Sequence, residues 1–238
     1  ADELAQVSEF QSTMLSQIDA ADAGEKLIAD LRDRFGKAME KDGVLAEQRS
    51  ARAASFAKEL EQVNATDTAV AMIDRTILQP SIKAINEKFK EQPTVDASLR
   101  HTLANLYMFP GMYPEAMTLQ RLAVDTRRRV LGDDHPDTLL SQSQMADLLY
   151  FTAKIDEAIA LQRDTLERCM RVLGPDHRDT LNVTGSLGNL LQGQGKFAEA
   201  EPLLRSTLDG RRRVLGSESR DTLAALNVYG LLLMMQGK

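Results

Sequence analysis

The tripeptide Asp-Thr-Leu at residues 137–139 decides the fold, because it recurs at residues 179–181 and 221–223. Consecutive copies are 42 residues apart (179 − 137 and 221 − 179). A second tripeptide, Val-Leu-Gly, keeps the same frame at residues 130–132, 172–174 and 214–216. A fixed period of about 20–50 residues is typical of stacked supersecondary units, none of which buries its apolar face alone. The period therefore predicts a repeat array, and it favours binding over catalysis.

Each repeat has the pattern of a helix, a turn and a second helix. In the copy at residues 177–218, Leu181, Leu187 and Leu191 share one helical face. The glycine-rich stretch at residues 192–196 predicts a turn, and Gly216 has the position of a C-cap after the second helix. The same pattern gives repeats at residues 93–134, 135–176 and 177–218, with a partial copy at residues 219–238.

The repeats resemble the tetratricopeptide repeat in the small residue that stands early in each first helix, at Ala104, Ala146, Gly188 and Gly230. The usual unit has about 34 residues. This longer form, with its Asp-Thr-Leu start and Val-Leu-Gly end, is similar to the kinesin-light-chain class. The resemblance implies a right-handed superhelical array of helix pairs. It also implies that the first helices line the concave surface and the second helices the convex one.

Residues 1–92 are predicted to be helical but not repeated. Apolar residues at helical spacing predict about four helices, with a break at residues 23–24, an N-cap near residues 64–66, and a kink or split at Pro80. Strand-like alternation is nowhere sustained. The sequence therefore predicts an all-α chain, in which a helical region at residues 1–92 precedes the repeats at residues 93–238.

Residues 7–19 carry a second resemblance. Val-Ser-Glu-Phe-Gln at residues 7–11, with Met-Leu at 14–15 and Ile-Asp at 18–19, is similar to the segment after the membrane span of bacterial receptor-like Ser/Thr protein kinases. Gln-Pro-Thr-Val-Asp-Ala at residues 92–97 resembles the start of the repeats in that class. The resemblance implies a membrane-anchored kinase with a periplasmic, extracytoplasmic sensor domain for signal transduction. This chain is similar to the sensor part alone.

Two classes of function remain open. The chain contains no glycine-rich loop, His-Arg-Asp or Asp-Phe-Gly motif, so it is not predicted to be an enzyme itself. The first hypothesis is the extracytoplasmic sensor module of a Ser/Thr protein kinase. The alternative is a cytoplasmic scaffold or adaptor with no attached enzyme. An apolar run of about 20 residues upstream, preceded by kinase motifs, would favour the first.

Composition excludes several partners. The 238 residues carry a net charge of −6 and no basic stripe with interleaved aromatic residues, which argues against nucleic acid. No apolar run is long enough to span a bilayer, so a membrane is expected only through an upstream segment absent from this chain. Residues 236–238 match residues 194–196, so we expect a trimmed fragment that stops inside its fourth repeat. Its last helix is expected to self-associate or fray.

Candidate catalytic and metal-binding residues have simpler explanations. His135 and His177 occupy one repeat position beside acidic residues, and helix capping is favoured over metal ligation or a pH switch. The arginine runs at residues 127–129 and 211–213 are either an anion site or, as favoured here, solvated helix ends that complement the helix dipole. Cys169, the single cysteine, is interpreted as an incidental helix residue in preference to a redox sensor. The sequence therefore predicts no catalytic residue, no metal site and no cofactor.

Candidate binding residues follow from the repeat register of the first helices. Asn105, Asp147 and Asn189 share one repeat position and are predicted to form a polar ladder, flanked by Tyr150 and Phe151. The predicted groove residues are His101, Asn105, Ser143, Gln144, Asp147, Tyr150, Asn182, Ser186, Asn189 and Asn227. Asparagine can bond the backbone of an extended segment through both a donor and an acceptor. The sequence therefore predicts a protein or peptide ligand; the alternative is that these are ordinary solvent-facing helix residues.

Overall fold

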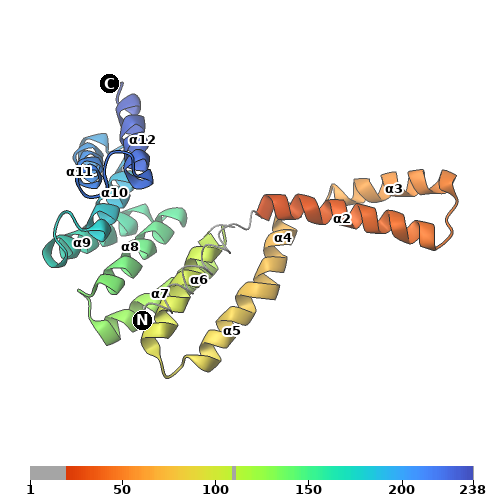
Figure 1. The fold of residues 1–238 in the computed structure, drawn as a ribbon, viewed down its shortest axis with the longest axis horizontal. Helices are drawn as coiled ribbons and strands as arrows, with labels where there is room; N and C mark the ends of the chain where they lie inside the picture. The colour runs from red at the N-terminus through yellow and green to blue at the C-terminus, as the bar shows by residue number, and fades with distance from the viewer. Residues whose placement is uncertain (1–19, 109–110, 238) are drawn as a thin grey trace. The chain divides into compact units, whose positions relative to one another are not determined.

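The computed structural model describes residues 20–108 and 111–237, and every regular element in these ranges is a helix (Figure 1). The prediction of an all-α chain is confirmed. The chain separates into two compact units, residues 1–88 and 89–238. The boundary expected from the sequence, between residues 92 and 93, lies four residues further along. The helix expected within residues 1–19 falls outside the described residues.

Between residues 20 and 88, the described part of the first unit, there are four α-helices. They are α2 (Ala20–Lys41), α3 (Ala46–Leu60), α4 (Ala65–Ile73) and α5 (Gln79–Lys88). Helix α2 packs against α3 and α4, and the rings of Phe35 and Phe56 stack with their centroids 4.2 Å apart. Asn64 caps α4 by accepting the Asp67 backbone N–H at 3.1 Å, which confirms the predicted N-cap.

The break predicted at residues 23–24 is wrong, because α2 runs through both positions. Gly24 is buried, and a Cβ atom added there would lie 2.5 Å from the Ala65 carbonyl oxygen. This glycine permits the close approach of α2 and α4. A glycine inside a helix therefore marks a contact here, and not an end.

Pro80 is preceded by a π-helical turn, η1 (Asp74–Leu78), and not by a break between two helices. The backbone N–H of Gln79 donates to the Asp74 carbonyl, five residues back. Proline lacks an N–H, and its ring crowds the carbonyl four residues before it. A widened turn just before the proline is one way to relieve that crowding, and α5 continues beyond it.

The second unit consists of helix pairs in the predicted order. The first helices are α6 (Pro93–Met108), α8 (Pro136–Phe151), α10 (Arg178–Gly193) and α12 (Arg220–Met235). The second helices are α7 (Tyr113–Leu131), α9 (Ile155–Val172) and α11 (Phe197–Leu215). Each helix packs against the next in sequence, and α10 also contacts the first helices α8 and α12. In Figure 1 this unit runs from yellow-green at α6 to blue at α12.

The ends of the repeat helices are set by residues that recur with the period. His135 and His177 each accept a backbone N–H two residues on through Nδ1, at 3.2 Å, which confirms the capping interpretation. Ser219 is the N-cap of α12, where its Oγ accepts the Thr222 N–H at 3.1 Å. Gly216 ends α11 with a φ of 84°, a conformation that side-chain-bearing residues rarely adopt.

Three of the four predicted packing positions, Ala104, Ala146 and Gly188, are closely packed, whereas nothing lies within 4 Å of a Cβ atom added at Gly230. Ala104 and Ala146 are fully buried, and a Cβ atom on Gly188 would lie 2.6 Å from Leu204 Cδ2. Around this contact the buried side chains of α9, α10, α11 and α12 form one apolar cluster that includes Leu191 and Leu232. Within the described ranges, no helix combines the length and the apolar character that crossing a bilayer requires.

Candidate functional site

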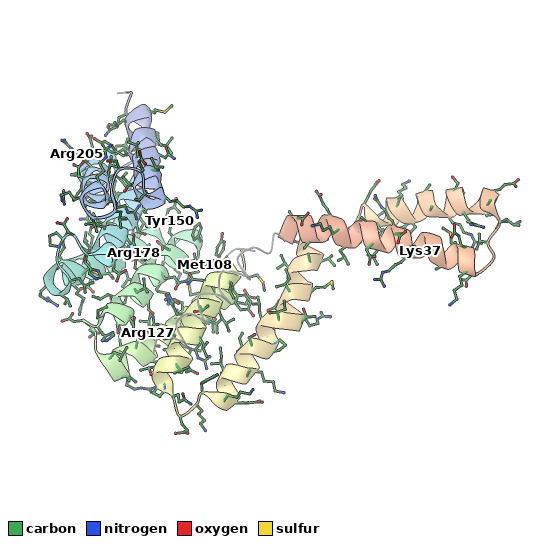
Figure 2. The ribbon with its side chains drawn as sticks, in the orientation of Figure 1. Lys37, Met108, Arg127, Tyr150, Arg178 and Arg205 are labelled. Carbon is green, nitrogen blue, oxygen red and sulfur yellow. The ribbon has the colours of Figure 1, made fainter. Side chains whose placement is uncertain are left out.

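A pocket of about 500 Å³ lies against the first helices of the repeats, and we call it the inner pocket. Its wall consists of Met108 from α6; Asp147, Tyr150 and Phe151 from α8; Asn182, Gly185, Ser186, Asn189 and Leu190 from α10; Leu204, Thr207 and Arg211 from α11; and Ala224, Ala225 and Val228 from α12. Met108 and Tyr150 are labelled in Figure 2. Of the predicted groove residues, Asp147, Tyr150, Asn182, Ser186 and Asn189 meet here.

Leu204 lines the inner pocket at a repeat position that is glutamine in the two earlier repeats. In the two earlier repeats the equivalent Gln120 and Gln162 are fully buried and reach the next first helix. Gln120 Nε2 donates to the Ser141 carbonyl at 2.7 Å, and Gln162 Nε2 donates to the Val183 carbonyl at 3.3 Å. A leucine has no donor, so Leu204 makes no equivalent hydrogen bond to α12.

Gly185 also lines the inner pocket and has no side chain. It occupies the repeat position of His101 and Ser143, and a Cβ atom there would lie 3.2 Å from Thr207 Cγ2. In the earlier repeats the side chains at this position point into the interior. Ser143 is buried and its Oγ accepts Gln162 Nε2 at 2.9 Å. Ser143 and His101 therefore belong to the packing between helices and do not line the inner pocket.

His101 has a neutral imidazole at pH 7. Burial lowers its pKa to about 4, with a further contribution from the positive charge of Arg127 and an opposing one from a hydrogen bond to Gln120. Its Nδ1 lies 3.2 Å from Gln120 Nε2. This arrangement suits a structural histidine that holds α6 against α7 and α8.

The predicted ladder is aligned, but its three positions are used differently. Asn105 accepts a hydrogen bond from the Gln144 side chain, and Asp147 Oδ1 accepts one from Ser186 Oγ at 2.6 Å. Both bonds join neighbouring first helices across 39 residues of sequence. Asn189 is exposed, and the residue 39 positions further on is Val228, which has no polar group to offer. The third position alone is free of such a bond among the residues the structure describes.

Arg211 also lines the inner pocket. The prediction that the arginine runs are solvated is wrong for the first arginine of each run, Arg127 and Arg211, which are buried or partly buried. Arg127 is only 5% exposed. Its guanidinium donates to the Asp137 carbonyl at 3.0 Å and to the hydroxyls of Ser141 at 2.6 Å and Ser98 at 3.1 Å. The first residue of each run falls on the inner side of its helix, while the two that follow are exposed.

The Arg211 guanidinium repeats this arrangement with one partner fewer. It donates to the Asp221 carbonyl at 3.0 Å and to Asn182 Oδ1 at 2.8 Å. Ala225 stands at the repeat position of Ser141 and offers no hydroxyl. In the middle repeat the position is held by Cys169, which is buried, so burial raises the pKa of its thiol to about 11, with a smaller contribution from Asp179.

Aromatic side chains form one end of the inner pocket. The ring of Phe151 is half exposed and stacks on Tyr113 with centroids 5.1 Å apart, while Tyr150 meets Phe151 edge-on at 5.7 Å. A Cβ atom on Gly193 would lie 2.7 Å from Tyr150 Oη, so the glycine leaves room for the tyrosine. Asn227, the last predicted groove residue, is exposed on α12 and lies outside the pocket wall.

The chemistry of this wall suits recognition. Its charged groups are Asp147 and Arg211, accompanied by the amides of Asn182 and Asn189 and by an apolar floor. In the described part of the chain, no group of three or more His, Cys, Asp or Glu side chains is placed to hold a metal ion. Donors and acceptors beside aromatic surface are what a binding site needs to orient a segment of another protein.

Comparisons with known proteins place the fold. The tetratricopeptide repeat family model matches residues 95–168, 141–213 and 179–238. Among solved structures, BtubC (BKLC) from P. vanneervenii superposes with a TM-score of 0.58 at 18% identity, covering 97% of this chain and 84% of that one.

Two crystal structures of a putative kinesin light chain from Podosopora anserina, with nearly identical TPR-like repeats, give TM-scores of 0.55 and 0.54. Both are 21% identical, covering 72% of this chain and 84% of the other. At such identities these likenesses concern the fold alone. No curated protein sequence matches the chain. Because the family model spans more than half of the sequence, the chain belongs to the tetratricopeptide repeat family.

Proposed function

We propose that this chain is a sensor module that holds an extended segment of a partner protein in the inner pocket. Tetratricopeptide repeats are generally protein–protein interaction modules and non-enzymatic scaffolds. The observation that carries the proposal is the meeting of five predicted groove residues in one pocket, where the exposed Asn189 amide stands beside Tyr150 and Phe151. A segment lying there contacts first helices from several repeats at once.

The sensor assignment rests on the resemblance to bacterial receptor-like Ser/Thr protein kinases at residues 7–19 and 92–97. In this proposal the chain is the periplasmic part of a membrane-anchored kinase, and a partner segment bound in the pocket is its signal. The second candidate, a cytoplasmic adaptor, is supported by the likeness of the fold to kinesin-light-chain-type repeats.

The sequence encoded upstream of Ala1 separates the two candidates. An apolar stretch of about 20 residues there, preceded by kinase motifs, supports the sensor. An upstream region without either feature overturns the sensor and leaves the adaptor. This determination does not depend on whether the inner pocket binds a partner.

Site-specific photo-crosslinking in the native cell tests the binding site. A photoreactive phenylalanine analogue replaces Asn189 in the pocket or, as a control, Arg205 on the outer side of α11, which Figure 2 labels. We expect one partner protein to be captured from position 189 and not from position 205. Capture from Arg205 alone, or no adduct at position 189, would overturn the pocket as the binding site.

A further inference from the structure

Two charged side chains of the inner pocket have no ionic partner. Asp147 is partly buried and accepts a hydrogen bond from the neutral hydroxyl of Ser186. Arg211 is also partly buried and donates to a backbone carbonyl and to the Asn182 amide oxygen. Within residues 20–108 and 111–237, neither takes part in a salt bridge. Partly buried charges without a counter-charge are costly, and such costs are characteristic of binding sites.

The Arg211 guanidinium has one hydrogen-bond acceptor fewer than the equivalent Arg127 guanidinium. Arg127 satisfies three oxygens, including the Ser141 hydroxyl, and is almost completely enclosed. At Arg211 the corresponding place is taken by Ala225, whose side chain lines the pocket. A guanidinium has five N–H donors, and that of Arg211 donates to the Asp221 carbonyl and the Asn182 side chain. Its remaining donors suit a carboxylate, which it can bind in a bidentate manner.

The Asp147 end has the features of a site for a cation. Burial raises the pKa of this carboxyl group, and the hydrogen bond from Ser186 partly offsets the rise. An incoming ammonium or guanidinium group would stabilise the ionised form of this carboxyl group. Tyr150 and Phe151 lie one helical turn further along α8 and line the same pocket. Their rings can cover the apolar stem of a lysine or arginine and attract its charge.

The partners of the two charges on α10 are spaced like alternate side chains of an extended segment. Their partners on α10, Asn182 and Ser186, are four residues apart, which is about 6 Å along a helix. Side chains on one side of an extended segment recur every second residue, about 6.5–7 Å apart. An acidic and a basic residue separated by one other can therefore reach both charges together.

We propose that the inner pocket selects a segment carrying an acidic and a basic side chain two positions apart, the acidic one bound by Arg211 and the basic one by Asp147. The proposal rests on the proposed function, since it names the chemistry of the segment that the pocket holds. A ligand with only one of the charges leaves the other pocket charge desolvated and unpaired, and the pocket therefore discriminates against it.

Capped, fluorescein-labelled heptapeptides test the proposal. The probes are Ser-Val-Lys-Val-Glu-Val-Ser, the same peptide with Lys and Glu exchanged, and versions in which Gln replaces either or both charged residues. Fluorescence anisotropy measures their binding to the whole chain. We expect one of the two-charge peptides to bind about tenfold or more tightly than either single-charge peptide.

Charge-removing variants connect the preference to the two residues. Asp147→Asn should abolish the advantage of Lys over Gln in the peptide, and Arg211→Gln should abolish the advantage of Glu over Gln. The controls Asp164→Asn on α9 and Arg205→Gln on α11 remove charges that are exposed and should change nothing. Asp147→Asn keeps the size of the side chain, and Arg211→Gln keeps a polar but shorter one. Thermal melts check that each variant is folded.

Two outcomes would overturn the charge-pair proposal. One is that neither two-charge peptide binds better than the single-charge peptides. The other is that the preference survives in Asp147→Asn or Arg211→Gln. Either result leaves the proposed function standing if photo-crosslinking from position 189 still captures a partner. Loss of the crosslink instead removes the pocket as the binding site and the charge-pair proposal with it.

Discussion

Gly188 and Gly230 occupy the same repeat position but have different surroundings. A Cβ atom on Gly188 would lie 2.6 Å from Leu204 Cδ2 and 2.7 Å from its Cγ, whereas nothing lies within 4 Å of one on Gly230. Gly188→Leu should destabilise the chain by about 1–3 kcal/mol, because the core must be overpacked. Gly230→Leu should be neutral or stabilise by up to about 1 kcal/mol, since glycine is a poor helix former. Thermal or urea melts that show equal effects would contradict the repeat register.

His101 should make the stability of the fold depend on pH. Burial, aided by the charge of Arg127, lowers its pKa from 6.5 to about 4 in the folded chain. Below pH 6.5 the unfolded chain takes up a proton that the folded chain does not bind, so stability falls as the pH drops toward 4.

The corresponding loss is at most about 3 kcal/mol between pH 7 and pH 4. His101→Gln should remove this part of the pH dependence. The difference between the two urea midpoints, measured across this range, isolates the histidine because all other groups are shared. A difference that does not change with pH would show that the folded imidazole titrates like an exposed one.

At the scale of elements, the crossing of α2 and α4 depends on Gly24. Gly24→Ala places a methyl group 2.5 Å from the Ala65 carbonyl oxygen, which is backbone and cannot move aside alone. We expect amide hydrogen exchange in α2 and α4 to accelerate, while the repeats keep their protection because stacked repeats couple mainly to their neighbours. The control is Gly36→Ala in the same helix, where nothing lies within 4 Å of the added methyl group. Unchanged protection in Gly24→Ala would mean that α2 and α4 do not pack as described.

The helices of the repeats could be predicted because their ends recur with the period. The helix caps stand at one repeat position, which is occupied by His135, His177 and Ser219, and the turn glycines also recur. A helix end identified in one repeat therefore predicts the equivalent end in the others. The first unit offers no such redundancy. Whether Gly24 ends a helix or admits a neighbour depends on Ala65, which is distant in the sequence.

The inner pocket could be predicted in part. Its first-helix residues follow from the register, but the contribution of the second helices was missed. Two features of the sequence could have indicated the second-helix residues. One is a departure from the period, where Leu204 replaces Gln120 and Gln162, and the other is the recurrence of Arg127 as Arg211. Whether such a residue lines a cavity depends on how far its side chain extends in the folded chain, and sequence spacing alone does not give that distance.

At the scale of the whole molecule, α12 presents an uncovered apolar surface. Leu231, Met234 and Met235 are 53%, 75% and 52% exposed. We expect this surface to cause self-association that increases with concentration, as the sequence predicts. Leu231→Ser combined with Met234→Ser should abolish it, whereas the control Met72→Ser on α4, also half exposed, should not. A sedimentation coefficient that stays constant with concentration would contradict this expectation.

The central claim is that a partner segment occupies the inner pocket, and one titration tests it most directly. The segment captured by crosslinking from position 189 is synthesised and titrated calorimetrically into the chain, into Asn189→Ala combined with Arg211→Gln, and into Arg128→Gln combined with Arg129→Gln. The last pair is exposed on α7 and spares the buried Arg127. We predict that the pocket variant binds about tenfold or more weakly, through the loss of hydrogen bonds worth about 0.5–1.5 kcal/mol each or more for the charged group, and that the α7 variant binds as the parent does. Weakened binding in the α7 variant with unchanged binding in the pocket variant would contradict the account and assign the site to the arginine run.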